Sequence, residues 1–321
     1  MPFVYRAATP ADRPALLRLF SAAFGEAADP DLWAWKYDEG PHRAPSAVAL
    51  AEGRIVGFYG GWATRYRGAR GDLPGAAAVD VMTDPAARGL GGGGLFAGLA
   101  SAFSELCREA GIPFYFGFPH ERHRLVGERK AGYASVGPAG QWARPLGSRS
   151  FLGPIRRRLL RTSVGDRVSP GHEALAEALH ARAGWRTDRS RPTLDWRFAP
   201  HGGASYRLVE ILDRRSASRG YAAVRLVGER ALLVDLQVRD EASGDVGDLL
   251  EAVRASLGGD AARLELRAPT GSPLAERLAA EFGFAPETSD CHFEIRPLDP
   301  AFDALAAGRA FDYRFADHEI F

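Results

Sequence analysis

The chain contains very little cysteine: Cys107 and Cys291 are its only two thiols among 321 residues. They lie in unrelated contexts and form no CxxC pair. This scarcity excludes a disulfide framework and a zinc site of the usual spacing. We therefore expect both side chains to be small buried hydrophobic groups, and we expect no metal.

The chain also lacks an excess of charge of either sign. Its 41 Lys and Arg residues nearly cancel its 40 Asp and Glu residues, so we expect no nucleic-acid or membrane partner. No apolar run is long enough to cross a bilayer, and residues 1–6 lack the features of a signal peptide. We expect a cytoplasmic protein, monomeric or homodimeric, whose affinity resides in a local site.

The most informative pattern lies at residues 81–96, where an apolar strand runs into an arginine and a glycine cluster that opens a helix. Glycine permits positive φ and lets backbone N–H groups approach a ligand. The first turn of a helix directs unpaired donors and the positive end of its dipole to the same place. The segment therefore predicts a site for a pyrophosphate.

One phosphate-binding pattern that these glycines match is the dinucleotide fingerprint. Gly89, Gly91 and Gly94 fit G-x-G-x-x-G. In that pattern the glycines follow the strand directly and an acidic residue ends a second strand about 20 positions on. Here residues 84–87 intervene, and Glu109 lies inside a helical stretch. The context therefore disfavours a dinucleotide site, while a glycine-rich helix start that binds nothing is a further alternative.

A second pattern fits the context better. Arg88-x-x-Gly91-x-Gly93, with Pro85 three residues before the arginine, resembles the acyl-coenzyme A loop of the GNAT acetyltransferases. The resemblance implies acetyl-CoA as the co-substrate. It implies that the pantetheine arm binds the backbone of Val81, Met82 and Thr83, and that the pyrophosphate binds Arg88, Gly89, Leu90, Gly91, Gly92, Gly93 and Gly94.

The order of predicted elements also resembles that family. Apolar periodicity and turn residues predict strands at 4–7, 46–51, 54–66, 76–83 and 113–119, and helices after 9–12, at 31–37, at 95–110 and from 120 to 131. In GNAT domains the strand before the loop and the strand after the next helix splay apart. The resemblance implies that the acyl thioester lies between them.

The second half repeats this order in outline. We expect strands at 205–212, 220–227, 231–237 and 262–266, and helices at 246–257 and 274–281. Residues 238–245 stand where a phosphate loop belongs, and their carboxylates, Asp240, Glu241 and Asp245, would repel a pyrophosphate. The predicted fold class is α/β, with two GNAT-like domains, each a mixed sheet flanked by helices. The expected boundaries are 1–145 for the coenzyme domain, 146–203 for a helical linker, 204–297 for the degenerate domain and 298–321 for a tail.

Two side chains near the expected acyl site are candidates for proton transfer. Asp80 directly precedes the thioester-binding stretch, where it could act as a base, directly or through one water. The alternative is a residue that fixes the loop or pairs with an arginine. His120 begins the helix after the next strand, where a histidine could accept a proton near neutral pH. The family often places a tyrosine acid four residues before the closing glycine, Gly132, but this chain has Glu128 there.

Aromatic residues suggest where the acceptor binds. Trp33, Trp35 and Trp62 are candidates for the wall of an acceptor pocket, with core packing as the alternative. The tail at 311–321 is too aromatic for a typical disordered end, so we expect it to dock. In one tandem-GNAT family, the enhanced-intracellular-survival aminoglycoside acetyltransferases, the terminal carboxylate enters the active site as a base. The resemblance in tandem plan implies that role for Phe321.

These observations together predict an N-acetyltransferase that moves an acetyl group directly from acetyl-CoA to a primary amine of a small molecule or peptide. A non-catalytic acyl-CoA-binding or regulatory protein on the same fold is the alternative. The missing tyrosine and the degenerate second half support that alternative.

Overall fold

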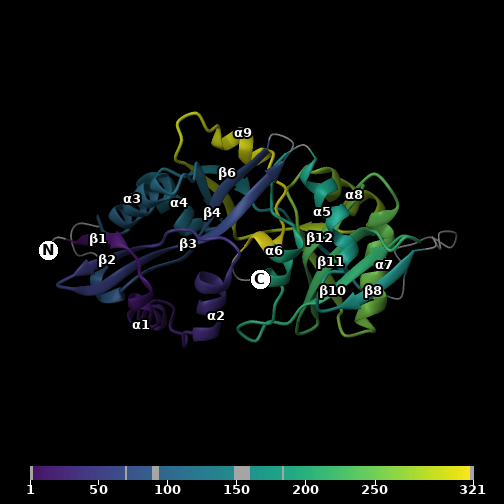
Figure 1. Ribbon diagram of the computed structural model, residues 1–321, viewed down its shortest axis with the longest axis horizontal. Helices are drawn as coiled ribbons and strands as arrows, with labels where there is room; N and C mark the ends of the chain where they lie inside the picture. The colour runs from purple at the N-terminus through teal and green to yellow at the C-terminus, as the bar shows by residue number, and fades with distance from the viewer. Residues whose placement is uncertain (1–2, 69–70, 89–93, 148–159, 183, 319–321) are drawn as a thin grey trace. The chain divides into compact units, whose positions relative to one another are not determined.

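The computed structural model describes residues 3–68, 71–88, 94–147, 160–182 and 184–318 (Figure 1). The chain forms two compact units. The first comprises residues 1–66, 72–137 and 291–309, and the second comprises 67–71, 138–290 and 310–321. Both units are α/β, with a mixed sheet flanked by helices, as predicted.

The first unit is built on a sheet with the strand order β1-β2-β3-β4-β5-β15-β6. Its strands are β1 (Val4–Ala7), β2 (Ala47–Ala51), β3 (Arg54–Gly68), β4 (Gly71–Thr83), β5 (Phe114–Gly117), β6 (Ala134–Pro138) and β15 (His292–Pro297). Its helices are α1 (Arg13–Phe24), α2 (Pro30–Ala34) with a π-helical continuation (Trp35–Glu39), α3 (Gly94–Glu109), α4 (Glu121–Ala131) and α9 (Ala304–Arg309).

Helices cover both faces of this first sheet. α3 and α4 lie on one face, and α1 and α2 lie on the other (Figure 1). On the first face Leu95, Leu99 and Phe103 of α3 pack on small residues of β2 and β4. On the second face Leu16 and Leu19 of α1 pack with Met82 at the end of β4. β4 therefore lies between two apolar layers, as expected for a central strand.

The second unit has the strand order β14-β7-β13-β12-β11-β10-β8. Its strands are β7 (Gln141–Pro145), β8 (Arg161–Gly165), β10 (Arg207–Leu212), β11 (Ser218–Val227), β12 (Arg230–Val238), β13 (Arg263–Arg267) and β14 (Ala285–Glu287), with the short β9 (Arg186–Thr187) outside this sheet. Its helices are α5 (Glu173–His180), α6 (Arg191–Arg197), α7 (Asp245–Leu257) and α8 (Pro273–Phe282).

Each sheet takes one strand from a part of the chain that the linear boundaries assign elsewhere. β7 ends the stretch expected to form the first domain, yet it pairs with β13 in the second sheet. β15 follows α8 in the sequence, yet it pairs with β5 in the first sheet. The expected boundaries at 145, 203 and 297 therefore differ from the two units, and β8, within the expected linker, is a strand of the second sheet. Strand pairing across a long sequence separation leaves no local signal in the pattern of apolar residues.

The predicted strands and helices of both halves are present with shifts of a few residues, except that strand β4 begins at Gly71. Cys107 and Cys291 are both buried, as predicted. Residues 148–159, near the start of the expected helical linker, lie outside the described residues. Among the residues that are described, no helix is both long enough and apolar enough to span a membrane.

Candidate active site

The central feature of the first unit is the place where β4 and β5 part. The two strands run parallel and are paired at Ala76 with Tyr115 and at Ala77 with Phe116. β4 then continues to Thr83, whereas β5 ends at Gly117. We refer to residues 78–83 together with Gly117 as the β4–β5 split. It is the parting that the GNAT resemblance implied.

Asp80 changes the direction of β4 within the split. Ala76, Ala78 and Val81 of β4 all face the core beneath α3. Side chains of a regular strand alternate between the two faces of the sheet, so a spacing of three from Ala78 to Val81 means that one extra residue is inserted between them. The extra residue is accommodated at Asp80, which has a φ of 48°. A side-chain residue with positive φ is uncommon and marks a local bulge. The bulge turns the backbone of residues 81–83 relative to the rest of the strand.

The Asp80 carboxylate is held by two groups from the π-helical segment after α2. It is 6% exposed. Its two oxygens lie 2.9 Å and 3.0 Å from the Lys36 Nζ, and the Tyr37 hydroxyl donates to Oδ2 at 2.7 Å. Gly60 of β3 permits this approach, because a Cβ there would lie 2.3 Å from the Tyr37 hydroxyl oxygen. Nothing in the local sequence pattern links Lys36 and Tyr37 to Asp80, so only the folded chain identifies them as its partners.

Arg88 is anchored at the end of β4. The Asp84 side chain accepts a hydrogen bond from the Ala86 backbone and caps the turn Pro85–Ala87. The Arg88 guanidinium then donates to the hydroxyl and the carbonyl of Thr83, at 3.3 Å and 3.2 Å. Gly89, Leu90, Gly91, Gly92 and Gly93 lie outside the described residues, and Gly94 begins α3. Arg88 after the end of β4 and the start of α3 at Gly94 therefore lie where the sequence predicted them, and the role of the glycines between them stays a prediction.

Positive charge from the start of α4 lies close to Arg88. The pKa of His123 is lowered by partial burial and by the positive charges of His120, Arg122 and Arg88. His120 is exposed and takes the N-cap position of α4, with its Nδ1 3.9 Å from the Cys291 Sγ. This arrangement suits a polyanionic ligand next to the N-terminus of α3.

Tyrosines that face α3 and α4 are bonded to one another. The hydroxyls of Tyr59 and Tyr133 lie 2.5 Å apart, and the Tyr115 hydroxyl lies 3.1 Å from the Ser104 Oγ. Burial raises the pKa of each of the three phenols. They therefore remain protonated at neutral pH and act as packing residues with satisfied hydrogen bonds.

The three tryptophans proposed for the acceptor are buried. Trp33 packs against Tyr37 and Phe58, with ring centroids 4.6 Å and 5.4 Å apart. Trp35 and Trp62 contact each other at 5.6 Å. All three have exposures of 7% or less. Core packing accounts for these contacts, and a role toward an acceptor stays a prediction.

Glu128 occupies the position, four residues before Gly132, where the family often has a tyrosine acid. Glu128 forms an ion pair with Arg124 on the surface of α4, and Arg124 also binds Glu121 at 2.7 Å. A second carboxyl group, Glu294 of β15, lies beneath this helix and is 1% exposed. The one local signal for Glu294 is its place between Phe293 and Ile295, which suggests a charge on a partly buried strand.

The second unit repeats the bulge of β4 at the same place in β12. Opposite β11 the register slips, so that Ala223 pairs with Asp235 but Val224 pairs with Leu233. The Asp235 carboxylate lies 2.7 Å from the Arg189 Nε and accepts from the Tyr221 hydroxyl at 2.5 Å. The tripeptides Val79-Asp80-Val81 and Val234-Asp235-Leu236 therefore correspond, which strengthens the internal repeat.

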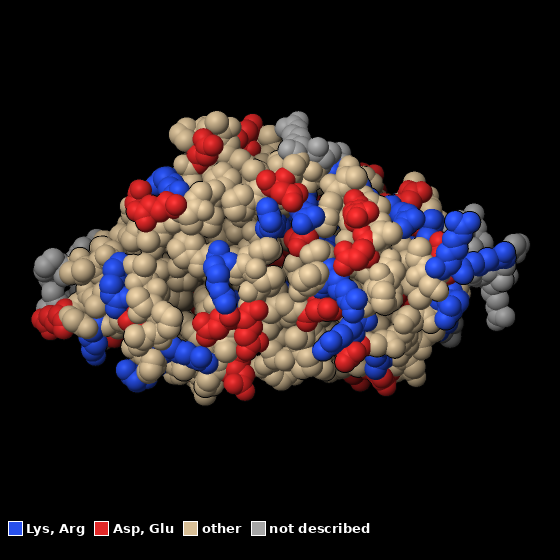
Figure 2. Space-filling model, in the orientation of Figure 1, with Lys and Arg blue, Asp and Glu red and all other residues tan. Residues whose placement is uncertain are grey.

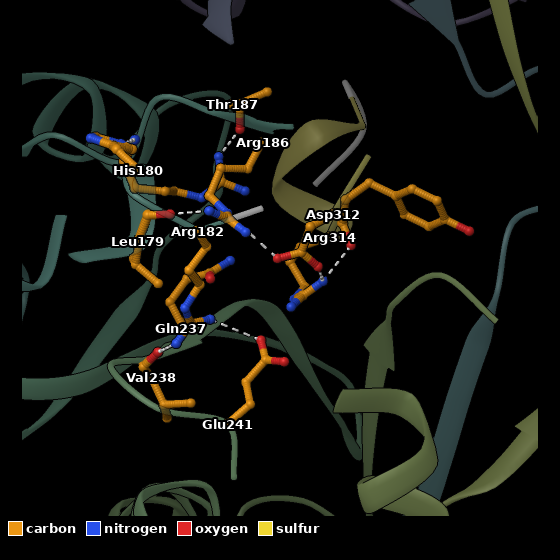
Figure 3. A network of polar contacts seen from close by, with 12 residues as sticks. Leu179, His180, Arg182, Arg186, Thr187, Gln237, Val238, Glu241, Asp312 and Arg314 are labelled. Carbon is orange, nitrogen blue, oxygen red and sulfur yellow. Dashed lines mark hydrogen bonds and ion pairs between the residues drawn. The ribbon is translucent and has the colours of Figure 1, made fainter. Parts of the chain in front are cut away.

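In the second unit the end of β12, residues 236–238, corresponds to the β4–β5 split, and arginine side chains bond its backbone. β12 is paired with β13 up to Leu233 and then continues to Val238. The Arg314 Nε donates to the Leu236 carbonyl at 3.3 Å, and Arg182 donates to the Val238 carbonyl. Figure 3 shows these arginines with Arg186 and Asp312 around the end of β12. The carbonyls that match those of Val81 and Thr83 are thus bonded within the chain itself.

The C-terminal tail docks in the second unit, as predicted. Residues 311 and 313–318 are buried. Asp317 accepts hydrogen bonds from Arg189 and from Thr187, and the His318 Nδ1 lies 2.9 Å from the Arg267 Nη1. Both side chains are therefore engaged in structural contacts. Phe321, the proposed base, lies outside the described residues.

The surface carries no dominant charge on the face drawn in Figure 2, where acidic and basic side chains are interleaved. This agrees with the balanced composition of the chain.

Comparison with known proteins identifies the fold and the first unit. A family model described as an acetyltransferase (GNAT) domain matches residues 4–134. A GNAT N-acetyltransferase from Anabaena variabilis superposes with a TM-score of 0.70 at 17% identity, over 92% of this chain and 73% of that one. The tandem GNAT protein of the clavulanic acid biosynthesis pathway gives 0.60 at 16% identity, over 94% and 100%. The Eis1 protein of Mycobacterium abscessus gives 0.58 at 16%, over 93% and 74%. No curated protein matches the chain.

Residues 4–134 therefore form a GNAT acetyltransferase domain, and the chain as a whole has the fold of the tandem GNAT proteins. The family match supports acyl transfer as the class of chemistry.

Proposed function

We propose that the first unit binds acetyl-CoA at the β4–β5 split and transfers the acetyl group directly to a primary amine of a small molecule or peptide. The observation that carries this proposal is the split itself. β4 leaves β5 after Ala77, and the bulge at Asp80 then turns the backbone of residues 81–83. Backbone N–H and C=O groups at such a place can pair with the amides of a pantetheine arm.

The pyrophosphate end is assigned to Arg88 and to the start of α3. Arg88 is exposed and held by Thr83, so its remaining N–H groups can meet a phosphate oxygen. The glycines at 89–93 and the N-terminus of α3 supply further donors in this proposal.

Direct transfer requires an uncharged amine, stabilisation of the developing oxyanion and a proton for the departing thiolate. We assign Asp80 to positioning the bulge rather than to proton abstraction, because Lys36 and Tyr37 already occupy its oxygens. His120 is exposed at the start of α4 and remains the candidate to accept the amine proton, directly or through water.

The test is a panel of amines, including aminoglycosides, amino sugars, polyamines, amino acids and short peptides, read by release of free thiol from acetyl-CoA. We expect turnover with at least one amine. Arg88→Ala should weaken acetyl-CoA binding about 10-fold to 100-fold, because hydrogen bonds to a charged group contribute about 1.5–3 kcal/mol. Arg18→Ala is the matched control, since Arg18 is exposed on α1.

The outcomes separate the two functions under consideration. Binding of acetyl-CoA without turnover across the panel would favour the non-catalytic acyl-CoA-binding protein. Unchanged affinity in Arg88→Ala, or no binding by the unaltered protein, would overturn the assignment of the site.

A further inference from the structure

This inference rests on the proposed function and concerns the proton that the departing thiolate requires. A general acid that protonates the sulfur as the C–S bond breaks accelerates departure of the thiolate of coenzyme A. Glu128, at the position that the family often gives to a tyrosine, is bound to Arg124 on the helix surface. Another group must therefore supply the proton.

Glu294 lies beside the split. It is directly opposite Gly117, the last residue of β5, in the antiparallel pairing of β15 with β5. Side chains of directly opposed residues project on the same face of a sheet. Gly117 places no side chain between Glu294 and the split, and a Cβ at Gly117 would lie 3.7 Å from the Ala78 carbonyl of β4.

The Glu294 side chain faces α4. Its neighbour Phe293 faces the opposite side of the sheet, where its ring stacks on Phe118 with centroids 5.1 Å apart. The Glu294 Oε2 would lie 3.3 Å from a Cβ at Gly127 of α4, so this glycine allows the helix to pack directly over the carboxyl group.

Glu294 is buried, and one of its carboxyl oxygens accepts no hydrogen bond among the described residues. The residue is 1% exposed, and the oxygen in question is Oε1. An unsatisfied buried carboxyl oxygen is costly, and native proteins keep few of them without a functional reason.

The surroundings of Glu294 favour its neutral form. Burial, together with the negative charges of Glu128 and Glu121 and against the positive charge of Arg124, raises the pKa of Glu294 to about 8. Tyr133 packs beside it as a neutral phenol. On β15 itself, His292 binds Glu121 at 2.9 Å and Arg296 donates to the Gly132 carbonyl at 2.9 Å. At neutral pH the Glu294 carboxyl group therefore carries a proton that it can donate.

We propose that Glu294 is the general acid of this site and donates its carboxyl proton to the sulfur of coenzyme A. The amine nitrogen forms the new C–N bond and releases one proton to water or His120. The C–S bond breaks, its electron pair passes to sulfur, and sulfur takes the proton of Glu294. The Glu294 carboxylate then regains a proton from solvent, so that one proton passes in net from amine to thiol.

The test compares Glu294→Gln with the unaltered protein, using Glu105→Gln on the exposed surface of α3 as the matched control. Glutamine keeps the shape but cannot act as an acid. We expect kcat to fall about 100-fold or more, with acetyl-CoA affinity changed less than twofold. The rate of the unaltered protein should decline above about pH 8, and this decline should be absent in Glu294→Gln. Glu294→Asp should restore part of the rate.

An independent measurement follows the protonation of Glu294 itself. With ¹³C-labelled glutamate carboxyl groups, one resonance should titrate near pH 8 and be missing from Glu294→Gln. A resonance for Glu294 that titrates near pH 4.5 would overturn the proposal, as would an unchanged kcat and pH profile in Glu294→Gln. Failure of the proposed function looks different, because the unaltered protein would then bind acetyl-CoA and acylate no amine.

Discussion

Asp80 and Asp235 occupy the same place in the two sheets. Each follows a valine at a bulge in the central strand, accepts a hydrogen bond from a tyrosine hydroxyl and pairs with a buried cation, at 2.9 Å to Lys36 and 2.7 Å to Arg189. The second unit has Asp235 at this place even though Arg314 and Arg182 bond the carbonyls of Leu236 and Val238 next to it. We therefore assign both aspartates to holding the bulge, which is the feature that both units share.

Asp80→Asn and Asp235→Asn should each lower the free energy of unfolding by about 3–5 kcal/mol, because each removes a buried negative charge that pairs with a buried cation. Denaturant titration measures this. The matched control is Asp38→Asn, where a half-exposed carboxylate lies 3.4 Å from Arg13 and should cost less than about 0.5 kcal/mol. An Asp80→Asn protein of unaltered stability whose kcat falls by two or more orders of magnitude would instead identify Asp80 as the base.

The second unit should bind no coenzyme. Arg314 and Arg182 bond the carbonyls of Leu236 and Val238, and Glu241 lies 3.0 Å from Arg182 in the loop that would face a pyrophosphate. Calorimetric titration with acetyl-CoA should therefore give one site per chain, and Arg88→Ala should weaken that single site. Two sites of similar affinity would contradict the reading of the second unit as degenerate.

Local patterns in the sequence predicted the strands, the helices and the loop that begins at Arg88, because those depend on apolar periodicity, caps and glycines close together in the chain. They did not predict that β7 joins the sheet of the second unit or that β15 joins the sheet of the first unit. A short strand can pair with the edge strand of either sheet. Which sheet it joins depends on its packing against residues far away in the sequence.

The same limit applies to the site. The place of Asp80 directly before the thioester-binding stretch identified it as a candidate, but its partners Lys36 and Tyr37 lie more than 40 positions away and only the folded chain joins them. Glu294 reaches the split because β15 pairs with β5. No residue near Glu294 in the sequence indicates that pairing.

The tail should be essential to the stability of the second unit. Asp317 accepts from both Nη groups of Arg189 and from the Arg314 backbone, all of them buried. Asp317→Asn should therefore lower the free energy of unfolding by about 3–5 kcal/mol, while Asp166→Asn on the exposed loop after β8 should change it little. Acetyl-CoA affinity, measured at a temperature where both variants are folded, should not change. Equal stability of the two variants would show that the tail contributes little.

Glu294 should make the stability of the protein depend on pH in a defined direction. Its pKa is about 8 in the folded state against an ordinary value of 4.5, so between these values the folded state holds more protons than the unfolded state. The stabilising contribution of this group is therefore complete below about pH 4.5 and is lost as the pH rises through about 8. Glu294→Gln lacks this titration.

The difference in Tm between Glu294→Gln and the unaltered protein should accordingly shift in favour of the glutamine variant as the pH rises from 5 to 8, and then level off. Glu128→Gln tests the same titration by changing the charge next to Glu294 while leaving Glu294 in place. Removing the negative charge of Glu128 lowers the pKa of Glu294 in the folded state, so the loss of stability should be smaller and should level off at lower pH. Thermal unfolding followed by circular dichroism at half-unit steps of pH measures both effects. Parallel Tm curves for Glu294→Gln and the unaltered protein would mean that Glu294 is ionised throughout this range, and the assignment of Glu294 as an acid would then be wrong.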